Sequence, residues 1–192
     1  EMDIINRCFS DLLTSDPIPP TSRLPFTKEE IKRVWEHQKE PWVDTVLILL
    51  YSGWRISELL NLKPEDINLQ AGTMKGGTKT KAGKDRVVPI HSKIRPLVEA
   101  RLAEGGPRLI SYNGRVCNQT QYRIFWADIM KALEMNHTPH ECRHTFETQL
   151  DSAGANRKCI DLLMGHVSKD TGNRVYNHKT LDELKAAVEL VE

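Results

Sequence analysis

The sequence predicts an α+β fold that is mainly α, with a small antiparallel β-sheet near one edge. Most of the 192 residues fall into segments with apolar side chains at helical spacing, separated by proline and glycine. Only residues 65–92 differ, because they combine glycines with short β-branched runs. With 28% charged and 39% hydrophobic residues, the chain has the composition of a globular domain with one core.

The first third of the chain predicts four helices separated by breaks. Residues 1–15 are amphipathic, and the proline-rich residues 15–25 that follow cannot continue a helix, so they predict a linker. Residues 27–30 have the Thr-x-x-Glu spacing of a capping box at the start of the next helix. Residues 42–53 are apolar nearly all round, which predicts a buried helix ended by a glycine. Residues 56–62 form a further helical stretch.

The rest of the chain predicts a lysine-rich hairpin and then more helices. Residues 65–92 read as the small antiparallel sheet with its turn. Further helices are expected at residues 92–104, 119–135, 139–153, 156–164, 168–176 and 181–191. The fullest apolar faces belong to two of these helices and comprise Ile124, Phe125, Ile129, Met130 and Leu133 in one, and Leu181, Leu184, Val188 and Val191 in the other.

Charge and cysteine usage narrow the class of protein. The net charge of +1 argues mildly against a nucleic-acid binder, which is often strongly basic. Locally, however, residues 75–101 carry eight cations against Asp85 and Glu99, namely Lys75, Lys79, Lys81, Lys84, Arg86, Lys93, Arg95 and Arg101. The four cysteines form no CxxC pair, which predicts reduced thiols in an intracellular protein and no metal site. The longest apolar run is too short to span a bilayer, so we expect no membrane partner.

The segment TPHECRHTFE, residues 138–147, gathers cationic groups at the start of a helix. Thr138 suits the N-cap and Glu141 completes a capping box, which places His140 in the first turn and Arg143 three residues later on the same face. A helix N-terminus already favours an anion such as phosphate, and these side chains strengthen that preference. Taken alone, the cluster is more often a solvated basic helix end.

Three other segments carry candidate residues, each with an ordinary structural alternative. Arg55 lies among apolar residues and needs either an anion or its i+3 neighbour Glu58 as partner. A lysine on the hairpin could contact a phosphate or donate a proton, although lysine also commonly protects a sheet edge. Gly165 ends a helix just before His166, and Tyr176 follows ten residues later, where a packing role is the commoner one.

The order of these segments resembles the catalytic domain of the tyrosine recombinases, the phage integrase family. "SGWRISELLNLKPEDIN" is similar to the first arginine box of that family, and "KTKAGKDRVVPI" to its hairpin lysine segment. The stretch "HECRHTFETQLDSAGANRKCIDLLMGHVSKDTGNRVY" resembles its second box. The hairpin is most similar to that of integrases from conjugative transposons. The step from His166 to Tyr176 is one residue longer than in many members, and the hairpin carries extra lysines.

The resemblance implies metal-free DNA strand transfer through a covalent 3′-phosphotyrosine, with no cofactor. The implied catalytic residues are Arg55, Lys79, His140, Arg143, His166 and Tyr176. In these roles the two arginines clamp the phosphate, Tyr176 is the nucleophile with His140 as base, and a hairpin lysine protonates the leaving 5′ oxygen. Lys79 is the first choice for that acid and Lys81 the second. Glu58 is expected to orient Arg55, whereas Lys75, Lys81, Lys84 and Arg86 are expected to bind DNA.

The expected organisation has three parts. Residues 1–24 are interpreted as a helix and linker from an upstream DNA-binding domain, residues 25–180 as the catalytic domain, and residues 181–192 as a tail helix. The expected partners are double-stranded DNA and further copies of the chain, from dimer to tetramer, joined through the tail helix. The expected location is the bacterial cytoplasm, at the nucleoid. The alternatives are a type IB topoisomerase-like nicking-closing enzyme and a non-catalytic DNA-binding module of the same fold.

Overall fold

The structure is a computed structural model that describes residues 24–77, 83–166 and 179–192. Its helices are α1 (Lys28–Glu36), α2 (Val43–Leu50), α3 (Ile56–Leu59), α4 (Arg95–Ala103), α5 (Gln119–Ala132), α6 (Pro139–Ser152), α7 (Arg157–Met164) and α8 (Leu181–Val188). Single 3₁₀ turns lie at Pro64–Asp66 and Ser92–Ile94. The predicted mainly helical α+β class is confirmed. The helices expected at residues 1–15 and 168–176 lie outside the described residues.

Three short strands form the predicted antiparallel sheet. The strands β1 (Ile67–Asn68), β2 (Thr73–Gly76) and β3 (Arg86–Pro89) are hydrogen-bonded in the order β1-β2-β3. The β2–β3 register pairs Thr73 with Pro89 and Gly76 with Arg86. A second, two-stranded hairpin joins β4 (Ser111–Tyr112) to β5 (Arg115–Val116).

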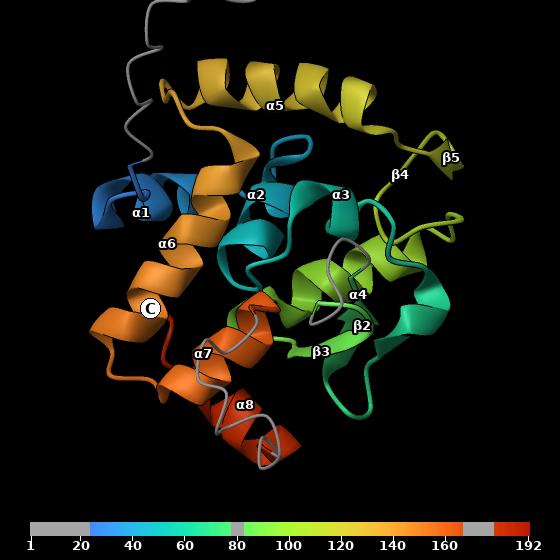
Figure 1. Cartoon of the computed structure of the whole chain (residues 1–192). Helices are drawn as coiled ribbons and strands as arrows, with labels where there is room; N and C mark the ends of the chain where they lie inside the picture. The colour runs from blue at the N-terminus through green and yellow to red at the C-terminus, as the bar shows by residue number, and fades with distance from the viewer. Residues whose placement is uncertain (1–23, 78–82, 167–178) are drawn as a thin grey trace, which may run out of the picture.

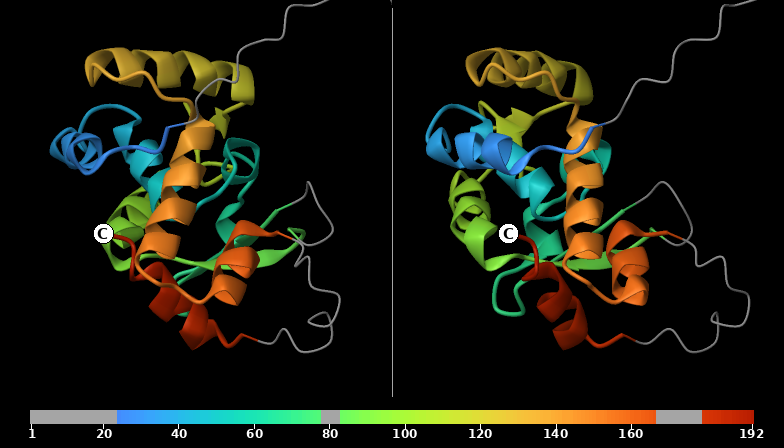
Figure 2. Two further views of the ribbon diagram at one scale, coloured as in Figure 1. Left: turned by 60° about the vertical axis from the view of Figure 1, so that its left-hand side comes forward. Right: turned by 90° about the vertical axis from the view of Figure 1, so that its left-hand side faces the viewer.

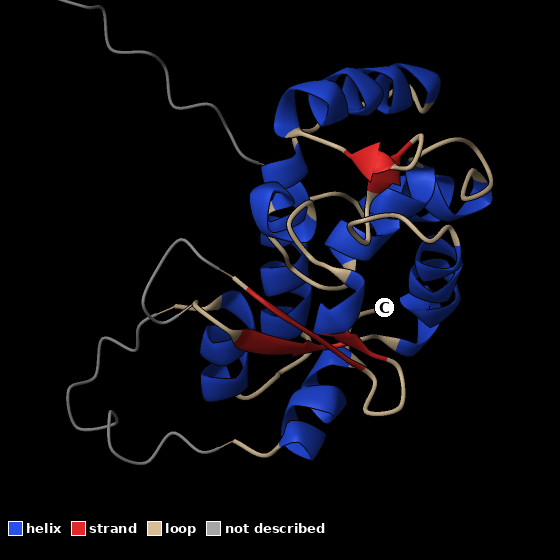
Figure 3. Ribbon diagram, turned by 90° about the vertical axis from the view of Figure 1, so that its right-hand side faces the viewer, coloured by secondary structure: helices blue, strands red, loops and turns tan. Residues whose placement is uncertain are grey.

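The fold is organised around α2 and α6. Every residue of α2 except Asp44 is buried, which agrees with its apolar sequence, and α2 packs along α6. In Figures 1 and 2, α5 lies across one end of the domain, the three-stranded sheet lies toward the other, and α6 runs between them. Figure 3 shows the sheet with helices gathered around it, and both α7 and α8 contact β3. The sheet is therefore held at the end of α6 where α7 follows.

Helix ends are fixed where the sequence predicts capping. Thr27 and Glu30 form the expected capping box of α1, with the Thr27 N–H donating to Glu30 Oε2 at 2.8 Å. The Thr138 N–H donates in the same way to Glu141 Oε2 at 2.8 Å at the start of α6. Gly165 follows α7 in the left-handed region, with φ 61° and ψ 40°, as a helix-ending glycine does.

The imidazole of His137 joins the starts of α1 and α6. Its Nε2 lies 3.1 Å from Glu30 Oε1 and its Nδ1 lies 3.0 Å from Glu141 Oε2, while its ring stacks on Phe26 at 3.9 Å. The Phe26 N–H also donates to Thr145 Oγ1 of α6 at 2.8 Å. The carboxylates of Glu30 and Glu141 thus have two roles. Each caps the start of its own helix, and both contact the His137 ring, which links α1 to α6.

The predicted apolar face of α5 is partly wrong, because Ile124 is exposed, Phe125 is only partly covered, and Tyr122 and Trp126 are buried in their place. Ile124 is 60% exposed, whereas the buried side chains of this region are Tyr122, Trp126, Ile129, Met130 and Leu133. These five residues follow the i, i+4, i+7, i+8, i+11 spacing of one helix face, and Ile124 lies off it. On α8, burial of Leu184, Val188 and Val191 matches the prediction, while Ala187 is buried and Leu181 is only partly covered.

In the part of the chain that the structure describes, no helix has both the length and the apolar character needed to cross a bilayer.

Gly53 provides a direct test of how α2 is joined to the rest of the domain. It has φ +62°, and a Cβ placed on it would lie 2.4 Å from Phe146 Cδ1. We expect Gly53→Ala to combine the left-handed backbone cost of about 1–2 kcal/mol with about 1–3 kcal/mol from forcing a side chain into a packed core. Urea denaturation at equilibrium measures the loss in free energy of unfolding.

Gly154→Ala is the matched control for this substitution. Gly154 has a similar φ of +74°, but nothing lies within 4 Å of the position that a Cβ would take. Its substitution should therefore show only the backbone cost. An equal loss of stability in the two variants would contradict the close contact between Gly53 and Phe146.

Candidate active site

Arg55 is held at the start of α3 by Glu58. Its Nη1 donates to Glu58 Oε1 at 3.1 Å, and its backbone N–H donates to Glu58 Oε2 at 3.1 Å. The Glu58 side chain is 1% exposed and that of Arg55 is 19% exposed, so the carboxylate is inside and the guanidinium reaches toward the surface. Glu58 is thus the partner of Arg55, as the structural alternative from the sequence expected. The pairing still leaves the Arg55 guanidinium partly exposed and accessible to a ligand.

Arg143 lies on α6, three residues after His140, and it is almost completely buried at 2% exposure. Its Nη1 donates to the Gly53 carbonyl at 2.7 Å, and its Nη2 donates to the Met164 carbonyl. The Nη2 atom also lies 3.4 Å from His166 Nε2. Within the described ranges, its hydrogen bonds go to carbonyls and an imidazole and none goes to a carboxylate.

Arg86, which was expected from the sequence to bind DNA, is buried. Lys75 and Lys84 on the hairpin are exposed as expected. Arg86, by contrast, has a side chain that is 4% exposed, and its Nη2 donates to Glu58 Oε2 at 2.8 Å. Its guanidinium stacks on the Trp54 ring at 4.0 Å. The reason is the register of β3, where alternate side chains point to opposite faces of the sheet and Arg86 lies on the buried one.

His166 follows Gly165 at the end of α7, as the sequence suggested. Its Nε2 faces Arg143, and its Nδ1 lies 3.9 Å from Glu147 Oε1. Burial lowers the pKa of His166, and the positive charges of Arg143 and Arg55 lower it further, while Glu147 acts in the opposite direction. The imidazole is therefore biased toward its neutral form, which can accept or relay a proton.

His140 occupies the first turn of α6 and is exposed. Its ring meets that of His144 edge-to-face, with centroids 4.7 Å apart. The neighbouring Cys142 is fully buried, and burial raises the pKa of its thiol well above the ordinary value. His140 is thus on the accessible end of the helix that carries Arg143, whereas Cys142 belongs to the core.

Positive charge exceeds negative charge in the arginine cluster, which is formed by Arg55, Arg86 and Arg143 around Glu58. Burial, and then the charges of Arg55 and Arg86, lower the pKa of Arg143 to about 9. Burial alone would raise the pKa of Glu58, but the hydrogen bond and charge of Arg86, followed by those of Arg55, bring it below its ordinary value. One buried carboxylate therefore faces three guanidinium groups. Such an arrangement favours an added anion.

Lys79, Lys81 and Tyr176 lie outside the described residues. The chain is described up to Gly77 and again from Gly83, and both glycines lie close to the cluster. A Cβ on Gly77 would be 2.9 Å from Arg86 Nη1, and a Cβ on Gly165 would be 2.8 Å from Gly83 Cα.

Part of the basic zone at residues 75–101 is structural. Arg101 donates to both carboxylate oxygens of Asp44 at 2.6 Å and stacks on Trp42 at 4.9 Å. Arg95 pairs with Glu99 one turn later on α4 at 2.8 Å. The α4 half of this zone therefore carries cations that fix the fold, and the hairpin half carries the exposed lysines.

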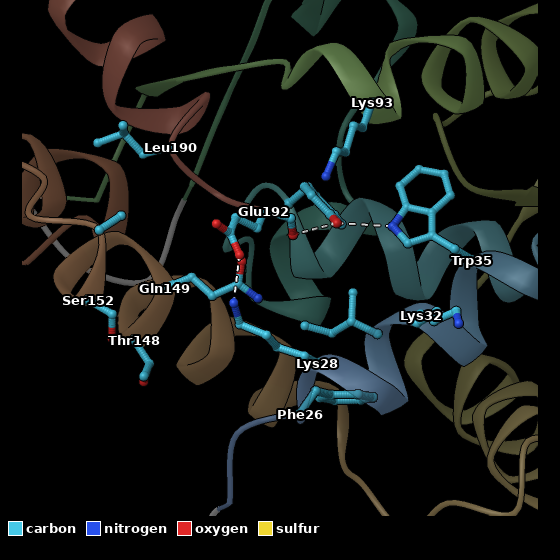
Figure 4. A pocket seen from close by; sticks show the side chains of 13 residues that line it. Phe26, Lys28, Lys32, Trp35, Lys93, Thr148, Gln149, Ser152, Leu190 and Glu192 are labelled. Carbon is cyan, nitrogen blue, oxygen red and sulfur yellow. Dashed lines mark hydrogen bonds and ion pairs between the residues drawn. The ribbon is translucent and has the colours of Figure 1, made fainter.

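A cavity of about 830 Å³ lies elsewhere, between α1 and the last residues of the chain. Figure 4 shows Phe26, Trp35, Lys93 and Leu190 around it, with Lys28 bonded to Glu192. The lining includes none of the arginines or histidines of the candidate site. We therefore place the candidate site at the arginine cluster, where the charge is, and not at this cavity.

A helical domain that gathers arginines and histidines at the base of a lysine hairpin has the form of a tyrosine recombinase catalytic domain. The model of the phage integrase family matches residues 26–183. The tyrosine recombinase XerA of Pyrococcus furiosus is 34% identical over 193 residues, which cover 94% of this chain and 66% of that protein. The chain therefore belongs to the phage integrase family.

Solved structures show the same fold. The crystal structure of XerA recombinase superimposes with a TM-score of 0.68 at 26% identity, covering 93% of this chain and 68% of that one. The Tn1549 transposon integrase, in complex with circular intermediate DNA, gives a TM-score of 0.67 at 24% identity over 94% of this chain and 68% of that one. The chain spans about two thirds of the length of the XerA relative that it matches.

Two features of the site were not recognised from the sequence. Glu147 faces His166, and its place on α6 one turn after Arg143 was the available signal. Trp54 beside Arg55 is buried under the Arg86 guanidinium, and no local signal in the sequence indicates this stacking, because the two residues are far apart in the chain.

Anion binding to the cluster can be tested without DNA. We expect sodium sulfate to raise the Tm of the wild-type domain more than sodium chloride of equal ionic strength, by about 3–5 °C if the sulfate concentration is roughly ten times its Kd. In Arg55→Met the excess should shrink, because the guanidinium that reaches the surface is gone. Differential scanning fluorimetry measures both.

Sulfate also stabilises proteins in general through exclusion from their surface. Arg95→Met, which changes an arginine paired with Glu99 away from the cluster, controls for this effect and should keep the wild-type increment. If Arg55→Met and Arg95→Met respond alike, the cluster does not bind the anion.

Proposed function

We propose that this domain cuts and rejoins DNA at specific sites through a covalent 3′-phosphotyrosine intermediate. The observation that carries the proposal is the guanidinium of Arg143, which is 2% exposed and hydrogen-bonded to carbonyls rather than to a carboxylate among the described residues. An unneutralised buried cation is costly unless an anion completes the site. A phosphodiester supplies that charge, and more charge gathers on its oxygens in the transition state.

In this proposal the arginine cluster binds the non-bridging oxygens of one phosphate. Arg55 and Arg143 approach it from the start of α3 and from α6, and Glu58 keeps Arg55 in place. His166 adds a hydrogen bond beside Arg143. These positions are set by buried contacts, so the donors are organised before the substrate arrives, and little reorganisation is needed during the reaction.

The proposed chemistry is a substitution at phosphorus. The Tyr176 oxygen attacks the phosphorus while its proton passes to His140, and the P–O5′ bond breaks. The leaving 5′ oxygen takes a proton from Lys79, or from Lys81. The bond between phosphorus and the Tyr176 oxygen replaces the broken P–O5′ bond, so the phosphate remains a diester. A 5′ hydroxyl of the same or another strand can therefore reverse the step without an added energy source. The anchoring of Gly77 and Gly83 beside Arg86 supports a role for the lysines between them.

Double-stranded DNA is the proposed partner, in a cytoplasmic setting at the bacterial nucleoid. The relatives support this choice, because XerA is named a tyrosine recombinase and the Tn1549 integrase is titled as a complex with DNA. Exposed Lys75 and Lys84 on the hairpin would contact the backbone around the cleaved phosphate. The near-zero net charge suggests that an upstream domain, joined through residues 1–24, contributes much of the affinity.

We also propose that copies of the chain assemble on DNA, as dimers to tetramers. The expected link was the tail helix, and α8 bears on this directly. Leu184, Ala187 and Val188 of α8 are buried in their own domain, against α7 and β3. A tail that joined two protomers would therefore have to exchange this packing for the same packing on a neighbour, and deleting it would also expose the core.

The nucleophile is tested with a nicked suicide substrate, in which the cleaved strand end diffuses away and traps the covalent adduct. We expect the wild-type protein to form a protein–DNA adduct that survives denaturing electrophoresis, and Tyr176→Phe to form none, because it lacks the attacking oxygen. Band intensities give the extent of reaction. Binding of both proteins to the same DNA, measured by fluorescence anisotropy, shows that the variant still folds and binds.

Adducts that persist in Tyr176→Phe would show that the nucleophile is wrong. If the wild-type protein binds its DNA site but never forms an adduct, the chain is a binding module of the same fold. Exchange of labelled strands between two duplexes distinguishes a recombinase from a topoisomerase-like enzyme, which relaxes supercoils without exchanging partners.

The two candidate acids are separated by changing the leaving group. Removing the lysine that protonates the 5′ oxygen should slow cleavage of normal DNA by about 10²–10⁴-fold. The same variant should regain speed on DNA with sulfur in place of that bridging oxygen, because a thiolate leaves without a proton. We expect Lys79→Ala to show this rescue and Lys81→Ala to show only weaker DNA binding. Single-turnover cleavage rates measure both, and rescue confined to Lys81→Ala would reverse the assignment.

A further inference from the structure

Arg86 connects three segments that carry the candidate site. From β3, its Nη2 donates to Glu58 Oε2 at 2.8 Å, and Glu58 in turn holds Arg55. Its Nε donates to the Leu163 carbonyl at 3.1 Å, in the last turn of α7. Its Nη1 is buried under Gly77, at the base of the lysine hairpin. One guanidinium therefore touches the arginine-bearing helix start, the hairpin and the helix end that precedes His166.

The end of α7 depends on two arginines together. The last four carbonyls of a helix lack partners within it, and here Arg86 binds the Leu163 carbonyl while Arg143 binds that of Met164. These are consecutive residues, and Gly165 and His166 follow directly. A shift of the Arg86 guanidinium would therefore move the turn from which His166 reaches Arg143.

The geometry around Arg86 leaves it little freedom. It is stacked on Trp54 at 4.0 Å and is 4% exposed. A Cβ on Gly165 would come within 3.3 Å of Arg86 Cδ, so the α7 end closes tightly over its stem. A planar guanidinium that donates from Nε and from Nη2 while it stacks on an indole fits this position, whereas the single ammonium of lysine could replace only part of these contacts.

We propose that Arg86 is a positioning residue for DNA cleavage, which fixes Glu58 and Arg55 on one side and the α7 end with His166 on the other. This inference rests on the proposed function and replaces the surface DNA contact expected from the sequence. Arg86 acts through these groups and does not touch the substrate. A purely structural arginine would hold the sheet to α7 without affecting the chemistry at equal fold stability.

The chain supplies a matched control in Arg101. It too is a largely buried arginine that stacks on a tryptophan, Trp42, and pairs with a carboxylate, Asp44. The comparison uses Arg86→Met, Arg86→Lys and Arg101→Met in the full chain, under conditions in which circular dichroism shows each to be folded. Single-turnover cleavage of the suicide substrate gives the rate, and varying the protein concentration separates weaker DNA binding from slower chemistry.

We expect Arg86→Met to lower the saturating cleavage rate by about 10–100-fold, the size of effect produced by displacing a catalytic group by about 1 Å, with little change in apparent Kd. Arg86→Lys should recover part of this loss. Arg101→Met should cleave at the wild-type rate despite its lost ion pair.

A pH profile adds a readout that structural damage alone would not change. Burial raises the pKa of Glu58, and in the wild-type protein Arg86 from β3 and Arg55 at the start of α3 overcome it, with Arg143 of α6 also nearby. Without Arg86, the pKa of Glu58 rises, and a protonated Glu58 no longer holds Arg55. The ratio of Arg86→Met to wild-type rates should therefore fall as the pH is lowered. In the double variant Glu58→Gln/Arg86→Met, position 58 has no carboxylate to protonate. The ratio of its cleavage rate to the wild-type rate should therefore be independent of pH.

Wild-type cleavage rates in Arg86→Met, or equal losses in Arg86→Met and Arg101→Met, would overturn the positioning role. So would a ratio that does not change with pH. Failure of the proposed function looks different, because then the wild-type protein itself forms no Tyr176-dependent adduct on DNA that it binds.

Discussion

The ion pairs of Glu58 with Arg55 and Arg86 are the interaction on which the candidate site depends. A carboxylate that is 1% exposed requires close partners, and it has two, at 3.1 and 2.8 Å. Because those partners come from α3 and β3, the pairing fastens the sheet to the helical core beneath the site. Removal of either partner leaves the buried carboxylate with one guanidinium instead of two, so the site and the fold share this part of the structure.

The surplus of positive charge in the arginine cluster has a cost in free energy. Arg143 would be more stable, as an isolated group, in water than among two other guanidinium groups, and its pKa of about 9 reflects that. Carbonyls of Gly53 and Met164 hold it without neutralising it. A phosphate bound as proposed would offset this surplus of positive charge, so electrostatic attraction would contribute to its binding.

Local signals in the sequence predicted much of this structure. The capping boxes at Thr27 and Thr138 and the helix-ending Gly165 depend on residues within one turn, and the structure contains all three. The Asn113-Gly114 pair, with φ of 50° and 70°, is a local signal of the same kind, because Asn-Gly favours a tight hairpin. Ile124, by contrast, is exposed although it is apolar, because it lies off the helix face that Tyr122 and Trp126 occupy.

Local signals do not predict contacts between residues that are far apart in the chain. The sequence offered Glu58 as a local partner for Arg55, but nothing in it showed that Arg86, 28 residues away, would reach the same carboxylate. Which of two alternating faces of β3 is buried depends on a register that only the folded sheet fixes. The resemblance to a family groups Arg55, Arg143 and His166. The structure shows the physical links between them, which are the backbone carbonyls of neighbouring residues that Arg143 binds, the Glu58 carboxylate and the end of α7.

The bridge through His137 has a consequence for how the protein is made. Glu30 and Phe26 find their partners in His137 and Thr145, 107 and 119 residues further along the chain. During synthesis α1 therefore leaves the ribosome long before the groups that join its start to α6 exist. Until α6 emerges, the capping box of α1 and its packing on α2 can form, but the start of α1 still lacks its contacts with His137 and Thr145.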